Sequence, residues 1–198
     1  MSTVGLEGTF AEMLTIAQPG DYLFFWNHDP IALAIEALTH GPSHVIQLAK
    51  FTPSQQFYEF EAVFPQGARL LPLSHYANNP HRMLLCRRQG ITDADVAIAT
   101  ASALRTLGRG YNWPEEIRIA LHDILRVVPI GASTNTLYCS GYLQLNFAET
   151  SVPFLSMPQE NDTPDFLLHD PKTMPLYWVN APPKAGSGPA APPPSGHP

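Results

Sequence analysis

The sequence predicts an α+β fold in which antiparallel strands lie on one side and helices on the other. Strand-like segments follow one another at short intervals between residues 44 and 87, whereas the clearest helical patterns come after residue 92. Hydrophobic residues make up 44% of the 198 residues and charged residues 14%. This composition is typical of a globular chain with a core of its own.

The chain is expected to form one domain, residues 1–180, followed by a disordered tail, residues 181–198. Seven of the last eighteen residues are proline and three are glycine. A segment of this composition cannot bury enough apolar surface to become ordered, so a flexible, extended end is predicted.

The first half of the chain is punctuated by turn residues. Gln18-Pro19-Gly20-Asp21 predicts a turn that leads into a buried aromatic strand over residues 22–26. Pro30 is suited to the first position of a helix whose body is residues 31–38 and which Gly41-Pro42 ends. Further strands are expected over residues 44–51, 57–64, 69–73 and 82–87.

Helices dominate the second half. Thr92 and Asp95 form the pattern of a capping box for a helix that runs to Leu107, before Gly108. A second helix is predicted from Trp113-Pro114, since apolar residues recur at helical spacing through Val128. A third contains Leu143 to Glu149. A short helix after Thr163-Pro164-Asp165 and a late strand over 176–179 complete the pattern.

Charge and hydropathy exclude several classes of function. The formal charge of −6 and the pI near 5.7 argue against a nucleic-acid partner, which requires a basic surface. No apolar run approaches the roughly 20 residues that span a bilayer, and residues 1–10 do not resemble a secretory signal. The expected location is cytoplasmic, or exported without a cleaved signal peptide, with a secretion machine or an inhibitor protein as potential partners.

Cys139 is the strongest candidate for a nucleophile. It stands between a turn-rich loop, residues 129–136, and the segment 143–149, which contains no helix breaker. A thiol in the first turn of a helix is exposed to unpaired backbone N–H groups and to the positive end of the helix dipole. Both favour the thiolate, which is the nucleophilic form.

A cysteine nucleophile also requires a proton acceptor, and His44 at the head of a predicted strand is the candidate. An isolated histidine in a strand is more often a structural residue, but the presence of Cys139 favours the catalytic interpretation. Glu59 and Glu61 share one face of the next strand, and either could orient the imidazole. The alternative is two carboxylates that face water.

Two further interpretations compete with this one. A Cys86–Cys139 disulfide would exclude the enzyme, although two cysteines in a chain of this size fit a reducing compartment better. Eight histidines suggest a metal, but Gly41-Pro42 breaks the geometry between His40 and His44, and the chain contains no Cys-x-x-Cys. We therefore expect no metal and no cofactor.

Several segments together resemble the NlpC-type branch of the papain-like cysteine hydrolases. Cys139-Ser140-Gly141-Tyr142-Leu143-Gln144 is similar to the family's Asp-Cys-Ser-Gly-Leu-Val-Gln motif, with Tyr138 in place of the Asp. Residues 19–25 are similar to its Pro-Gly-Asp-Leu-x-Phe-Phe strand, and residues 43–46 to its Ser-His-Val-Gly-Ile strand. The Cys segment follows the His segment, which is the order of the circularly permuted members.

The resemblance implies a permuted papain-like fold, a small antiparallel sheet or barrel packed against helices, with the Cys at a helix N-terminus. It implies Cys139 as nucleophile, His44 as general base and acid, and Glu61 as orienting group. Substrate contacts are expected from residues in or beside the matched motifs: Tyr22, Ser43, Tyr111 and Ser140. For Tyr111, a structural role beside the helix start at Pro114 is the simpler alternative.

The implied activity is hydrolysis of an amide bond, as in cell-wall peptides, through an acyl-enzyme. The first alternative is a lipid acyl hydrolase or acyltransferase, in which the aromatic residues of the predicted strands line an acyl pocket. The second is a binding domain without catalytic activity. The substrate is thus a peptide or a lipid.

Overall fold

The computed structural model describes residues 6–27, 30–52, 54–78, 81–111, 137–154 and 163–180. Its strands are β1 (Leu6–Gly8), β2 (Tyr22–Trp26), β3 (His44–Lys50), β4 (Phe57–Val63), β5 (Gly67–Pro72), β6 (Arg82–Arg88) and β7 (Thr173–Val179). Its helices are α1 (Phe10–Ile16), α2 (Pro30–Thr39), α3 (Asp93–Arg105), α5 (Cys139–Phe147), α6 (Pro164–Leu168) and the 3₁₀ turn η1 (Leu73–Tyr76). The α+β expectation is confirmed.

The strands form a single seven-stranded sheet in the order β1-β7-β6-β2-β3-β4-β5. Neighbouring strands are antiparallel except β1, which pairs with β7 in parallel. The expectation of a small antiparallel sheet or barrel packed against helices is met only in part. The sheet is mixed, and within the described residues no hydrogen-bonded ladder joins β1 to β5, so it is not a closed barrel.

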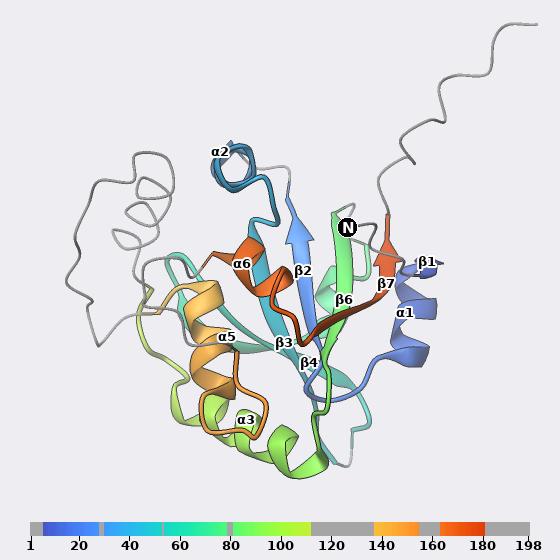
Figure 1. The fold of residues 1–198 in the computed structure, drawn as a ribbon, viewed down its shortest axis with the longest axis vertical. Coiled ribbons are helices and arrows are strands. Elements are labelled where there is room, and N and C mark those ends of the chain that lie inside the picture. Colours follow the sequence, from blue (N-terminus) through green and yellow to red (C-terminus); the bar gives the residue numbers. More distant parts are fainter. Residues whose placement is uncertain are drawn as a thin grey trace, which may run out of the picture.

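Side-chain alternation divides the central strands between two cores. Tyr22, Phe24, Val45, Leu84 and Cys86 face the first core, together with residues of α5. The intervening residues of the same strands, Leu23, Phe25, Ile46 and Leu85 among them, face a second core that α1 and η1 help to cover. Both faces of the sheet are thus buried, which explains why its central strands are apolar in nearly every position. Figure 1 shows α5 and α3 close together and α1 beside β1 and β7.

Most element boundaries agree with the sequence patterns. The capping box of α3 is formed by Thr92 and Asp95, and Pro30 is the first residue of α2. Thr163 caps α6 through its side chain. The helix predicted from Trp113-Pro114 and the tail over 181–198 lie outside the described residues. β1 and α1 were not predicted from the sequence, although Thr9 and Glu12 form a capping box.

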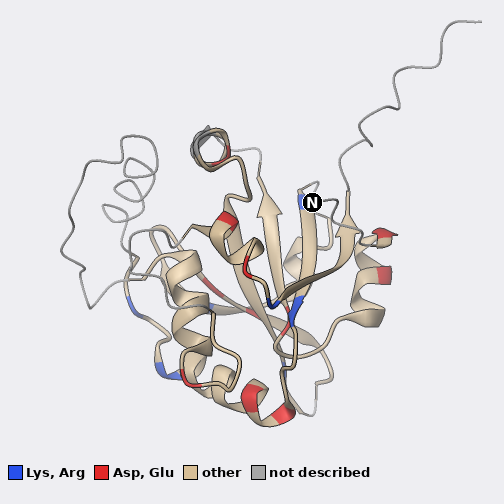
Figure 2. Ribbon diagram, in the orientation of Figure 1, with Lys and Arg blue, Asp and Glu red and all other residues tan. Residues whose placement is uncertain are grey.

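The surface charges follow no basic stripe over the described elements. Acidic residues mark α1 and the beginning of α3, whereas Lys and Arg are scattered (Figure 2). Among the described residues, no helix is both long and apolar enough to cross a membrane.

Candidate active site

Cys139 is the first residue of α5, as the sequence predicts. Tyr138 is the N-cap residue in an extended conformation, and its own side chain makes no capping hydrogen bond. The Tyr138 ring lies over Gly141, where an added Cβ would come within 2.7 Å of it. Glycine in the third position of this motif therefore lets the Tyr138 ring pack onto the first turn. The first N–H groups of a helix have no acceptor within it, so Cys139 lies in a region that favours negative charge.

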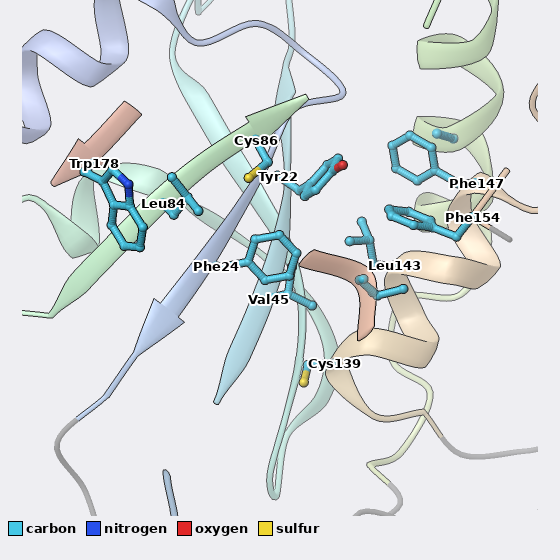
Figure 3. Close-up of a cluster of buried hydrophobic side chains, with 12 residues drawn as sticks. Tyr22, Phe24, Val45, Leu84, Cys86, Cys139, Leu143, Phe147, Phe154 and Trp178 are labelled. Carbon is cyan, nitrogen blue, oxygen red and sulfur yellow. The ribbon is translucent and has the colours of Figure 1, made fainter. Parts of the chain in front are cut away.

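Both cysteines are free, which removes the disulfide alternative. Cys139 is 2% exposed and lies at one edge of the first core, at the start of the α5 ribbon (Figure 3). Cys86 belongs to the same core but lies on β6, on the other side of Phe24. Burial and the negative charge of Asp21 raise the pKa of the Cys86 thiol. Cys86 is therefore a neutral structural thiol.

His44 is the first residue of β3, and its side chain lies between Cys139 and Glu61. Its Nε2 is 3.2 Å from Glu61 Oε2, and its side chain is 13% exposed. Burial alone would lower the pKa of His44, but interactions with Cys139 and with Glu61 outweigh it and raise this pKa to about 10. The imidazole is consequently a cation at neutral pH.

Glu61 accepts hydrogen bonds from three side chains and is 1% exposed. Besides His44, Arg69 Nε donates to Oε1 at 2.5 Å, and the Tyr76 hydroxyl donates to Oε2 at 3.4 Å. Burial tends to raise the pKa of Glu61, but His44 and Arg69 together lower it to about 2. Glu61 therefore carries a fixed negative charge that orients the imidazole and stabilises its cationic form.

Glu59 lies on the same face of β4 but in a different environment. It is fully buried, and burial together with the charge of Glu61 raises its pKa to about 9. His75 Nδ1 lies 2.9 Å from Glu59 Oε1, yet outside hydrogen-bond geometry, and no described residue makes a hydrogen bond to either carboxyl oxygen. Glu59 is thus neutral at pH 7 and is not the partner of His44. The alternative of two carboxylates facing water is wrong for both residues.

Three of the four expected substrate-binding side chains are engaged or enclosed elsewhere. Tyr22 is fully buried in the first core, where its hydroxyl meets that of Thr173. The Ser43 hydroxyl donates to Phe25 and Glu36 and ties β2 to α2. Ser140 is 1% exposed in the first turn of α5. All three side chains are buried, as Cys139 itself is, and their contact with a substrate remains a prediction.

Tyr111 pairs with the segment that directly precedes the nucleophile. It is half-buried, forms a bridge with Leu137, and packs its ring against the exposed Phe64. Its role in substrate binding remains a prediction. The other residues of the expected aromatic wall, 112–116, lie outside the described part of the chain.

Arg69 and Tyr76 are site residues that were not predicted from the sequence. The turn at Pro65-Gln66-Gly67 predicts a hairpin in which Val63 pairs with Gly67. Two positions further along each strand, Glu61 then pairs with Arg69, so this register could have indicated Arg69. No sequence pattern signals Tyr76, because it comes from η1 and reaches Glu61 only through the tertiary packing of the second core. Among the described residues, no group of three or more His, Cys, Asp or Glu could hold a metal ion.

Comparison with protein-family models and with curated proteins finds no match. Comparison with solved structures finds a similar fold in metalloprotein yiiX from Escherichia coli O157:H7, DUF1105. The TM-score is 0.60 and the sequence identity 18%, over 80% of this chain and 95% of that one. At this identity the similarity concerns the fold, a mixed sheet packed with helices.

Proposed function

We propose that the protein is a cysteine hydrolase that cleaves amide bonds with Cys139, His44 and Glu61. The observation that supports this proposal is the position of the His44 imidazole between a buried free cysteine and a buried carboxylate. Nucleophile, base and orienting group are then arranged as in a catalytic triad. The order of these residues along the chain is that of a circularly permuted papain-like enzyme, and we propose that fold relationship as well.

In the proposed reaction, the Cys139 thiolate attacks the carbonyl carbon of the substrate. His44 then donates its proton to the leaving amine, which departs as the acyl-enzyme forms. A water molecule that gives up a proton to His44 attacks the thioester, and the thiolate is regenerated. Backbone N–H groups at the start of α5 are suited to stabilise the oxyanion of each tetrahedral intermediate. Glu61 keeps the imidazole in orientation throughout.

The lipid alternative loses part of its support from the burial of the aromatic side chains. Tyr22, Phe24, Phe25 and Phe60 are fully buried, so they fill the cores instead of lining an acyl pocket. The aromatic residues of the predicted strands that keep exposed surface are Trp26, Phe51, Phe57, Tyr58 and Phe64. An amide is therefore the preferred substrate in this proposal, with a cell-wall peptide as the first candidate.

The two buried cysteines provide a matched test. Wild type, Cys139→Ala and Cys86→Ala are incubated separately with purified peptidoglycan and with phospholipid vesicles, and the products are identified by mass spectrometry. We expect peptide fragments from wild type and Cys86→Ala and none from Cys139→Ala, with all three proteins folded by circular dichroism. Cys139-dependent release of fatty acid would indicate the lipid hydrolase instead. Full activity of Cys139→Ala would reject the mechanism, and slow, ordinary alkylation of Cys139 at pH 6 would indicate a binding domain.

A further inference from the structure

Arg82, at the start of β6, lies between two tryptophan rings. Its guanidinium carbon is 4.2 Å from the centre of the Trp26 ring and 4.6 Å from that of Trp178. The two indoles are 5.2 Å apart and inclined at 39°. Trp178 is 6% exposed and belongs to the first core, so the stack rests on a rigid base. We call these three residues the tryptophan–arginine stack.

The donors of Arg82 have no anionic partner in the described part of the chain. Its Nε is buried without a hydrogen bond, and no ion pair involves it there. The carboxylate that interacts electrostatically with Arg82 is Glu36. Glu36 Oε1 already accepts hydrogen bonds from the Asn27 N–H and the Ser43 hydroxyl. Burial lowers the pKa of Arg82, yet a guanidinium stays protonated at neutral pH. A charge held in this way is normally neutralised by an anion.

The stack lies at the same end of the sheet as His44 and faces the same core as Cys139, whereas His44, like its strand partner Phe25, is on the face of the second core. Phe25 of β2 pairs with His44 on one side, and the next residue, Trp26, pairs with Arg82 on the other. Trp26 and Trp178 pack in the first core, to which Cys139 also belongs. Since β3 and β6 flank β2, the backbones of His44 and Arg82 are separated by two strand spacings, or about 10 Å.

We propose that Arg82 binds an oxyanion group of the substrate, a carboxylate or a phosphate, at a subsite beside the nucleophile. The planar guanidinium suits bidentate binding of either group. The two indoles hold it in one orientation, which reduces the entropy lost on binding. That the bound anion belongs to a substrate rests on the proposed function. It restricts that substrate to molecules with a negative charge a short distance from the scissile bond.

Binding is measured without turnover, so this test does not depend on the catalytic proposal. The Cys139→Ala protein is labelled with ¹⁵N and titrated with N-acetylglutamate, N-acetylglutamine and glycerol 3-phosphate. The indole N–H signals of Trp26 and Trp178, assigned with Trp→Phe variants, report occupation of the stack. We expect a saturable shift with one of the two anions and none with N-acetylglutamine. A preference for N-acetylglutamate identifies a peptide carboxylate, and a preference for glycerol 3-phosphate identifies a lipid phosphate.

Matched arginine variants complete the test in the same Cys139→Ala background. Arg82→Gln should weaken anion binding at least about tenfold, as expected for loss of a charge-assisted hydrogen bond. Arg82→Lys, which keeps the charge but not the planar fork, should have an intermediate affinity. Arg105→Gln removes a 59% exposed arginine of α3 and should change nothing. Equal binding of N-acetylglutamine, no response to either anion, or unchanged affinity in a folded Arg82→Gln protein would overturn the proposal.

Discussion

His44 Nε2 lies 3.2 Å from Glu61 Oε2, across two neighbouring strands. The same carboxylate also accepts a hydrogen bond from Arg69, so it is fixed at both oxygens. A carboxylate held in this way can keep the imidazole oriented and charged without moving during a reaction. The protonation states of His44, Glu61 and Glu59 are therefore the properties of the site that experiments can test most directly.

His44 should remain protonated until the pH approaches about 10. Since its pKa is raised above 6.5 in the folded protein, its contribution to stability is complete below pH 6.5 and is lost as the pH rises toward 10. Imidazole chemical shifts recorded by NMR across this range measure the titration. The His44 pKa should fall toward its usual value in Glu61→Gln and in Cys139→Ala, but not in Cys86→Ala. A wild-type His44 that titrates near 6.5 would contradict this protonation state.

Glu61→Gln should change the acid stability of the protein. The pKa of Glu61 is lowered from 4.5 to about 2, so its contribution is present above pH 4.5 and is lost as the pH falls through about 2. That contribution is on the order of 3 kcal/mol. Urea unfolding between pH 7 and pH 2 should show the loss in wild type and not in Glu61→Gln. Glu149→Gln, at a 71% exposed position, is the control and should behave as wild type.

The same substitution tests the role of Glu61 in the reaction. We expect Glu61→Gln to reduce turnover less than His44→Ala, because the amide can still contact the imidazole but cannot stabilise its charge. Glu59→Gln should leave turnover nearly unchanged, because the Glu59 carboxyl is not the partner of His44. A larger loss in Glu59→Gln than in Glu61→Gln would mean that Glu59 is the orienting group.

Glu59→Gln should stabilise the protein in alkaline solution. The pKa of Glu59 is raised from 4.5 to about 9, so folding keeps a proton that the unfolded chain releases. Stability attributable to Glu59 is therefore complete below pH 4.5 and declines from there to pH 9, by up to about 1.4 kcal/mol per pH unit. The variant should gain a few kcal/mol at pH 8 and nothing at pH 4, as measured by denaturant unfolding. Glu7→Gln on the exposed β1 should show no such gain.

Asp170→Ala should strongly destabilise the fold. Asp170 forms a fully buried ion pair with Arg88, whose guanidinium also donates to Val152 and Pro153. Removing the carboxylate leaves a buried cation, for which the loss is about 3–5 kcal/mol. Thermal and denaturant unfolding measure it. Glu149→Ala, which breaks the exposed pair with Arg105, should have little effect. Equal losses in the two variants would mean that the buried pair is not a main support of the fold.

Local patterns in the sequence were sufficient for most elements. The turn at residues 18–21, the capping box of α3, and the glycine and proline residues after α2 each depend on neighbours in the chain. β1 was missed because three exposed residues have no periodic pattern and become a strand only by pairing with β7, about 170 positions away in the chain.

For the candidate site, the sequence by itself determined the residue types, the position of Cys139 at a helix start and the shared face of Glu59 and Glu61. Tertiary structure decided which carboxylate meets His44, because both face the same side and differ only in what surrounds them. Arg69 and Tyr76 surround Glu61 and keep it charged, whereas Glu59 lies without a hydrogen bond to any described residue and is neutral. Tertiary packing also buried Tyr22, which the sequence had suggested as a substrate contact. Backbone patterns depend on neighbours in the chain, but protonation and exposure depend on residues that only folding brings together.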